Sequence, residues 1–167
     1  MPRLAIVTYP APVLLRKARL VRKVNRQVRR LARDMLETMY AAPGVGLAAP
    51  QVGVLRRVIV VDVAEAPITL INPEISAAEG EQVGLEGCLS VPDLVGEVTR
   101  AAWVRVRGLG GDGRLITLEG EGLLARALQH EVDHLNGVLF PARVEDITRL
   151  WRASDLSAAA ASEVTHI

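Results

Sequence analysis

The segment His130-Glu131-Val132-Asp133-His134 constrains the fold of this chain more than any other feature. Two histidines four residues apart lie on the same face of an α-helix, so both imidazoles can bind one metal ion if this segment is helical. Glu131 lies between them and can take a proton from a water that the ion polarises. The surrounding apolar pattern predicts a helix over 121–136 that ends at Gly137.

A catalytic metal ion usually has three protein ligands and one open position, so this motif requires a third ligand. Phe140 stands where a metzincin protease has its third histidine, which excludes that class. Cys88 is the strongest candidate, because Gly87 before it permits an unusual backbone conformation and Pro92 fixes the loop after it. Two imidazoles and one thiolate suit Zn²⁺ or Fe²⁺. Three downstream carboxylates are further candidate ligands: Glu145, Asp146 and Glu163.

A third segment, Gly44-Val45-Gly46-Leu47-Ala48-Ala49-Pro50-Gln51, consists mostly of small residues. It lacks the third glycine of the dinucleotide-binding fingerprint, and Pro50 argues against a helix that starts there. Small residues let a backbone approach a ligand closely. Gln51 can therefore present its side-chain N–H to an oxyanion near the metal.

Composition favours one globular catalytic domain over residues 1–167, since the chain has 50% hydrophobic and 23% charged residues. The net charge of +1 argues against chain-wide electrostatic binding of nucleic acid. One cysteine cannot form an internal disulfide. No apolar run reaches the roughly 18 residues of a transmembrane helix, and Tyr9, Pro10 and Pro12 interrupt the signal-like start. We expect a cytoplasmic monomer without membrane contact.

The apolar pattern predicts an α+β fold. Helical spacing over 24–41 ends at Pro43-Gly44, and a further helix is expected over 144–161. His166 is expected to fray. Strand-like segments separated by short turns occupy 57–63, 68–71, 97–108 and 115–118. We therefore expect small, mostly antiparallel sheets packed around a central metal-binding helix, with an N-terminal and a C-terminal helix.

Residues 16–33 carry nine basic side chains and no acidic one. Such a run is usually a solvated helix face. The alternative is a basic helix that contacts a polyanion such as RNA.

Three segments of the chain together resemble the sequence signature of peptide deformylases. That family has Gly-x-Gly-Leu-Ala-Ala-x-Gln, then Glu-Gly-Cys-Leu-Ser, then Gln-His-Glu-x-Asp-His-Leu. This chain has the three patterns in the same order, at residues 44–51, 86–90 and 129–135. Residues 9–14 also look like the N-terminal segment of the family, so the resemblance covers about residues 4–150.

The resemblance implies an enzyme that removes the N-formyl group from formylmethionine of nascent polypeptides and releases formate. It implies a bacterial or organellar setting, and we expect the bacterial cytoplasm. The implied metal ligands are Cys88, His130 and His134. Fe²⁺ is the implied native ion, one per chain, and Zn²⁺ or another divalent ion can replace it. Because such an enzyme acts at the ribosome, the basic helix 16–33 is a candidate docking surface for ribosomal RNA.

The candidate catalytic groups have separate roles. Glu131 takes the proton of the attacking water and delivers it to the leaving amine. The metal and the side-chain amide of Gln51 hold the oxyanion, and the resemblance implies that the backbone N–H of Leu89 does so as well. Asp133 faces away from the metal, and we expect it to form a salt bridge with a strand arginine.

The resemblance also implies how the substrate lies. Val45 and Gly46 pair with the peptide backbone to backbone. Arg126 departs from the family, which usually has an apolar residue in this wall of the methionine pocket. Its stem can line the wall while its head reaches water, or its head can alter side-chain preference or pair with a carboxylate such as Glu86. The side chains implied to shape the pocket are Val45, Glu86, Leu123 and Ala127.

Two other functions fit the same residues. The first is another zinc-dependent peptidase or amide hydrolase with the same ligands. The second is a non-enzymatic, metal-stabilised protein that binds RNA through residues 16–33. A structural zinc site would need a fourth protein ligand, for which the sequence offers no good candidate.

Overall fold

The computed structural model describes residues 3–167, in which nine strands form two sheets. Every strand pairing is antiparallel except that of β4 with β9. The five-stranded sheet contains, in spatial order, β1 Gly46–Ala48, β2 Val58–Val61, β3 Ile68–Glu79, β6 Trp103–Leu109 and β7 Leu115–Glu121. The four-stranded sheet contains β8 Leu150–Arg152, β5 Val91–Arg100, β4 Gln82–Cys88 and β9 Thr165–His166.

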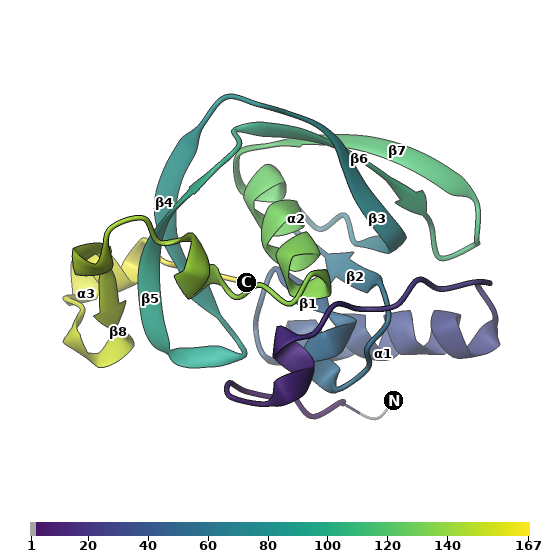
Figure 1. Cartoon of the computed structure of the whole chain (residues 1–167), viewed down its shortest axis with the longest axis horizontal. Helices are drawn as coiled ribbons and strands as arrows, with labels where there is room; N and C mark the ends of the chain where they lie inside the picture. The colour runs from purple at the N-terminus through teal and green to yellow at the C-terminus, as the bar shows by residue number, and fades with distance from the viewer. Residues whose placement is uncertain (1–2) are drawn as a thin grey trace.

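Helix α2, Gly122–Leu135, lies at the centre of the molecule, within the curve of the two sheets (Figure 1). Its apolar side chains pack with residues of β2, β3 and β6 in one hydrophobic cluster. Its histidines face the end of β4 instead. This arrangement confirms the expected α+β fold, with mostly antiparallel sheets around a central helix.

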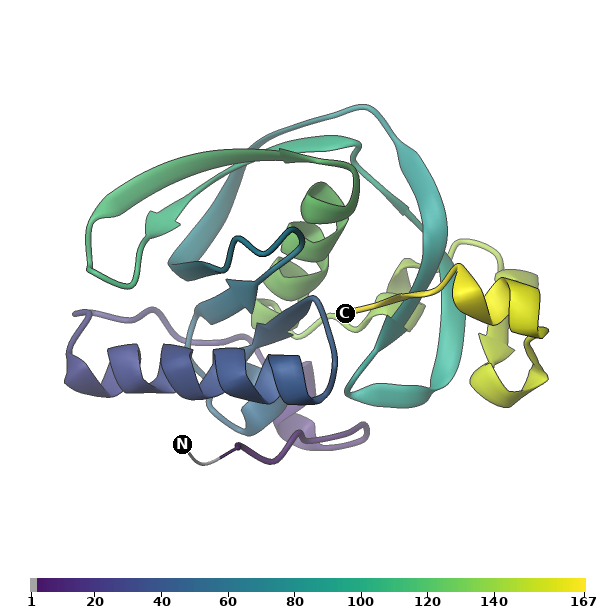
Figure 2. The ribbon, with the colours of Figure 1, turned by 180° about the vertical axis from the view of Figure 1, so that it is seen from behind.

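Helix α1, Arg26–Ala41, packs against β1 and β2 and spans the lower part of both ribbon views (Figures 1 and 2). It begins two residues later than expected because the Asn25 side chain accepts a hydrogen bond from Val28 N at 3.0 Å and caps the helix. The face toward the sheet buries Val28, Ala32, Met35 and Met39. This face supports β1, which leads into the 3₁₀ turn η2, Ala49–Val52, that contains Gln51.

Helix α2 ends as the sequence predicts. Asn136 is its C-cap, and Gly137 follows in the left-handed region with φ +74°. A Cβ at position 137 would lie 2.7 Å from the carbonyl oxygen of Leu15. Glycine is therefore required both for the backbone conformation and for the close approach of the Leu15 chain.

The hairpin around the 110–113 turn is confirmed, because β6 and β7 pair with Val106 opposite Leu118. The single strand expected over 97–108 is wrong. It is two strands, β5 and β6, that belong to different sheets and are separated at Ala101 and Ala102. Alternating burial continues through both strands, so periodicity alone could not detect the change of sheet.

The helix expected over 144–161 is also wrong. Leu150 and Trp151 pair with the β5 strand, which removes them from any helix. Only residues 158–162 form a short helix, capped by the Ser157 side chain. The elements in this region are the 3₁₀ turns η3 Phe140–Arg143, η4 Ile147–Arg149 and η5 Ala153–Asp155, strand β8, and helix α3 Ala158–Ser162.

Two further expectations need correction. His166 does not fray, because it pairs with Gly87 in the four-stranded sheet. The basic segment 16–33 is helical only from Arg26 onward, and its first part runs irregularly past Arg56. All nine basic side chains of this segment are exposed. Among residues 3–167, no helix has the length and hydropathy that a bilayer crossing requires.

Candidate metal centre

Helix α2 and the end of β4 bring three candidate metal ligands together. The His134 Nε2 atom lies 3.4 Å from Cys88 Sγ and 3.1 Å from His130 Nε2. The ligand atoms of the three residues all lie within 4.8 Å of one another, and all three residues are buried. The other three candidates, Glu145, Asp146 and Glu163, are exposed and lie outside this group.

Cys88 reaches this position because the pairing of β4 with β5 shifts register between Glu86 and Cys88 before the chain turns. Two donors point at its sulfur: the backbone N–H of Ser90 at 3.4 Å and the Gln51 side-chain amide at 3.6 Å. Without a cation, burial raises the pKa of the Cys88 thiol to about 12. A thiolate at this position therefore needs a positive partner, which a divalent ion between the two imidazoles would supply.

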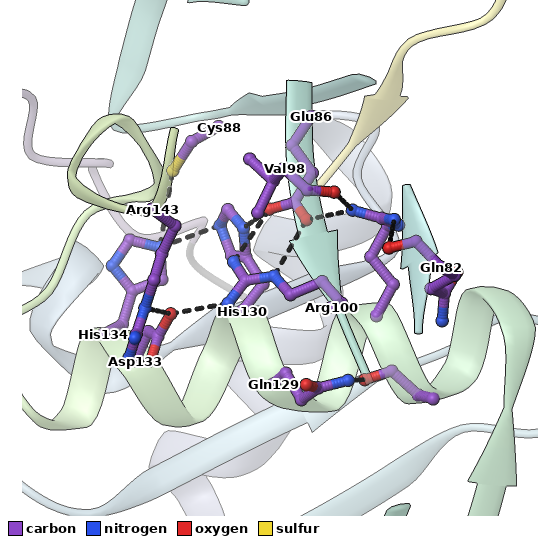
Figure 3. A network of polar contacts seen from close by, with 12 residues as sticks. Gln82, Glu86, Cys88, Val98, Arg100, Gln129, His130, Asp133, His134 and Arg143 are labelled. Atoms are coloured by element: carbon purple, nitrogen blue, oxygen red, sulfur yellow. Dashed lines mark hydrogen bonds and ion pairs between the residues drawn. The ribbon is translucent and has the colours of Figure 1, made fainter. Parts of the chain in front are cut away.

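The fold fixes the orientation of His130 and lowers the pKa of His134, as suits metal ligands. His130 donates from Nδ1 to Glu86 Oε1 at 2.8 Å, which turns its Nε2 toward Cys88 and His134 (Figure 3). Burial holds the pKa of His134 well below its usual value, and the adjacent His130 lowers it further. His134 therefore offers a lone pair to an ion at neutral pH.

Glu86 is the centre of a buried charge network (Figure 3). Its carboxylate accepts two hydrogen bonds from Arg100 at 2.9 Å each and one from Arg126 at 2.5 Å. Burial by itself raises the pKa of Glu86, but the hydrogen bonds from His130 and Arg100 lower it well below its usual range. Glu86 is therefore ionised and holds β4, β5 and α2 together.

Asp133, on the α2 turn that also carries His130 and His134, extends this network through Arg100. Its carboxylate accepts from Arg100 Nη1 at 2.6 Å and from Arg143 Nη2 at 2.8 Å. The expected salt bridge between Asp133 and a strand arginine is confirmed. Arg100 thus bridges two carboxylates, a role that its isolated position at the end of a strand did not indicate.

Glu131 differs from Glu86 and Asp133 because the fold gives it no partner. It is fully buried, and among residues 3–167 neither of its carboxylate oxygens has a hydrogen-bond partner. Burial raises its pKa well above the usual value, and the charge of Glu86 adds to the effect. A Cβ on Gly46 would lie 2.4 Å from Glu131 Oε1, so only glycine leaves room for this carboxylate. Buried polar groups are normally satisfied, and this one is poised for a ligand or a water.

The two expected oxyanion donors, Gln51 and Leu89, are neighbours of Cys88, the first in space and the second in sequence. Gln51 is fixed by its Oε1, which accepts from the backbone N–H of Ala48 at 2.9 Å. Its amide nitrogen faces Ser90 Oγ at 3.1 Å as well as the Cys88 sulfur. The backbone N–H of Leu89 donates to the main-chain oxygen of Ile167 at 3.2 Å, a contact that the sequence did not suggest.

The residues expected at the substrate separate into two sets. Val45 precedes β1, and Gly46 begins it beside Glu131. Ala127 is buried in the hydrophobic cluster against which Val45 packs. Leu123 is 38% exposed and is not part of that cluster. Glu86 and Arg126 face each other instead of a pocket.

Arg126 pairs with the Glu86 carboxylate, which was one of the alternatives for this side chain. Its side chain is 4% exposed, so the alternative in which its head reaches water is wrong. Besides Glu86, its guanidinium donates to the carbonyl oxygen of Val98 at 3.1 Å. A Cβ on Gly84 would lie 3.2 Å from its Nη2 atom, so the strand opposite packs closely against the buried head.

Peptide deformylases are similar to this chain in sequence and in fold. Residues 3–150 match the sequence model of polypeptide deformylase. A peptide deformylase from Alkaliphilus metalliredigens is 56% identical over 133 residues, which are 80% of this chain and 90% of that protein. One from Thermomicrobium roseum is 54% identical over 154 residues, 87% of this chain and 88% of that protein.

Solved structures of peptide deformylases have the same fold as this chain. The peptide deformylase of Synechococcus elongatus in complex with actinonin has a TM-score of 0.85 and 43% identity, over 89% of this chain and 82% of that one. The Thermotoga maritima peptide deformylase has a TM-score of 0.85 and 40% identity, over 87% of this chain and all of the other. This chain therefore belongs to the polypeptide deformylase family.

Proposed function

We propose that this chain hydrolyses the formyl amide of N-formylmethionine at the start of nascent polypeptides and releases formate. The observation that carries the proposal is the unpaired carboxylate of Glu131, buried next to a group of one thiol and two imidazoles. Membership of the deformylase family selects this reaction over the other zinc-dependent peptidases and amide hydrolases with similar ligands.

Cys88, His130 and His134 would hold one divalent ion per chain, and we propose Fe²⁺ as the native ion with Zn²⁺ as a substitute. Such an ion polarises a carbonyl group and makes water a better nucleophile at neutral pH. The donor set fits, because the ligand atoms of two imidazoles and of a thiol that needs a cation all lie within 4.8 Å of one another. Three protein ligands leave a position for substrate or water.

Glu131 moves the proton in this mechanism. Its carboxylate accepts a proton from the attacking water and donates it to the amine that leaves when the formyl C–N bond breaks. Burial raises its pKa, which makes it a stronger base than an exposed glutamate and allows it to hold the proton between the two steps. The fold uses neither of its oxygens elsewhere among residues 3–167.

Attack at the formyl carbon develops negative charge on the formyl oxygen, and this oxyanion needs donors that are already in place. The Gln51 amide is one, since the Ala48 N–H fixes its other end and points the nitrogen toward Cys88. The backbone N–H of Leu89 is the second proposed donor. Preorganised donors of this kind contribute about 10²–10³ each to kcat. Val45 and Gly46 would pair with the peptide backbone, and Ala127 and Leu123 would contact the methionine side chain.

The exposed basic residues of 16–33 supply a proposed contact with ribosomal RNA in the bacterial cytoplasm, where the chain would act as a monomer. Reversal of charge at Arg22, Arg26 and Arg29 should reduce co-sedimentation with ribosomes at low salt. Co-sedimentation that is unaffected by the reversal would contradict this contact.

Replacement of Glu131 by glutamine tests the proton-transfer role. The amide has the same shape but cannot accept the proton, so we expect formate release from formyl-Met-Ala-Ser to fall by at least about 10²-fold. Metal content, measured on the same samples, should be unchanged because Glu131 is not a proposed ligand. Glu119→Gln, at an exposed position of β7, is the matched control. Normal turnover by the Glu131 variant would contradict the mechanism.

Replacement of Arg126 by methionine tests whether its head contacts substrate. Loss of one partner of a buried ion pair should lower the free energy of unfolding by about 3 kcal/mol, measured by urea titration. Arg105→Met, which removes an exposed pair with Glu119, should cost less than about 1 kcal/mol. Because Arg126 faces Glu86, the ratio of kcat/KM for formyl-Met and formyl-Leu peptides should stay the same. A change in that ratio would show that the guanidinium determines specificity.

A further inference from the structure

Strand β9 and its neighbours, residues 164–167 (the β9 segment), lie directly beside the candidate metal ligands. Figure 2 shows this yellow segment leaving α3 and ending near α2 at the centre of the molecule, and it forms the edge of the four-stranded sheet. It runs parallel to β4, with Thr165 opposite Glu86 and His166 opposite Gly87. Residue 167 therefore lies beside the Gly87–Leu89 stretch that contains Cys88.

Three backbone hydrogen bonds hold the β9 segment between the two sheets. Ile167 N donates to Gly87 O at 3.1 Å, and Leu89 N donates to Ile167 O at 3.2 Å. On the other side, Val45 N donates to His166 O at 3.2 Å. The segment thus bridges β4 and the residue before β1, as an added strand in a groove does.

The side chains of the segment are also closely packed. Ile167 is 0% exposed and belongs to the hydrophobic cluster that includes Ala127 and against which Val45 packs. A Cβ on Gly87 would lie 3.2 Å from the His166 ring. The apolar side chain of residue 167 therefore lies in the same hydrophobic cluster as Ala127, which is proposed to contact the methionine side chain.

The β9 segment uses the groups that the proposed reaction requires. The N–H of Leu89, a proposed oxyanion donor, is bound to the Ile167 oxygen, and the N–H of Val45, a proposed peptide contact, is bound to His166. Cys88 is 5% exposed, and His130 and His134 are buried as well. A peptide cannot occupy the same donors and the same apolar site while this segment is present.

We propose that the β9 segment is an intramolecular competitor that occupies the substrate groove, and that a formylated peptide binds only after the segment has left. This proposal rests on the proposed deformylase function. Because β9 runs parallel to β4, it presents a main-chain oxygen to Leu89 and no N-terminal formyl group, so it fills the groove without being a substrate. The family match ends at residue 150, so the competing segment lies outside the matched region.

The kinetic consequence is specific. If the groove is open for only a fraction of the time, the apparent dissociation constant of a peptide equals the intrinsic one divided by that fraction. The chemistry after binding is unchanged. The β9 segment should therefore raise KM and leave kcat as it is. We expect an effect of about 10-fold or more, since an open fraction below about 10% produces it.

The test compares the metal-loaded full chain with two variants, one that lacks residues 164–167 and one with Ile167→Asp, which keeps the length but disfavours burial. Leu115→Asp, at a 74% exposed position of β7, is the control. Initial rates of formate release are measured over a range of formyl-Met-Ala-Ser concentrations. Both β9 variants should show KM lowered by about 10-fold or more with kcat within about twofold. The control should match the full chain.

A second readout does not depend on turnover. Amide hydrogen exchange at Val45 and Leu89 should be faster in both β9 variants than in the full chain, because their N–H groups lose their partners. The peptide Val-Thr-His-Ile, added at millimolar concentration to the deletion variant, should inhibit it competitively.

The outcomes separate the two proposals. Equal KM in the full chain and both variants, with formate released by all, overturns the β9 proposal and leaves the deformylase function standing. Loss of kcat in both variants also overturns it, because the segment would then be part of the working site. No formate from any of the proteins, each with one equivalent of metal, refutes the proposed function and the competitor role with it.

Discussion

The burial of the Glu86 carboxylate among His130, Arg100 and Arg126 is the interaction on which the candidate metal centre depends. A buried carboxylate lowers the stability of a fold unless it is paired and hydrogen-bonded. Here Arg100 of β5, and Arg126 and His130 of α2, donate to it. The same contacts orient His130 and hold the end of β4 beside the helix. Cys88, two residues after Glu86, therefore reaches the two imidazoles as a consequence of this network.

The contrast among the three buried carboxylates near the candidate metal ligands separates structural from chemical roles. Glu86 and Asp133 are surrounded by arginine and histidine donors, whereas Glu131 has no hydrogen-bond partner among residues 3–167. The absence of a side chain on Gly46 preserves the space that Glu131 needs. A fold that pairs two carboxylates and leaves the third unpaired beside a thiol and two imidazoles retains it at an energetic cost. That cost is understandable if Glu131 transfers protons.

The sequence predicts those parts of the molecule that depend on local patterns. The central helix follows from its apolar period, its end from Gly137, and the third ligand from the need to complete His130 and His134. Three other features depend on segments that are distant in the chain. They are the change of sheet near Ala101, the pairing of Trp151 with β5, and the binding of Ile167 to Gly87 and Leu89. Local periodicity does not identify such partners, so the expected helix over 144–161 and the fraying of His166 were wrong. The sequence predicts only part of the charge network, because an arginine in a strand does not indicate which carboxylate it will pair with.

The central claim is that Cys88, His130 and His134 together hold one divalent ion. X-ray absorption of the zinc-loaded protein tests it most directly, because sulfur and nitrogen scatter differently at the metal edge. The account predicts one sulfur at about 2.3 Å and two imidazole nitrogens at about 2.0–2.1 Å, with the remaining coordination from a light atom. A spectrum with nitrogen and oxygen ligands only, and no sulfur shell, would contradict the assignment of Cys88 and the arrangement built on it.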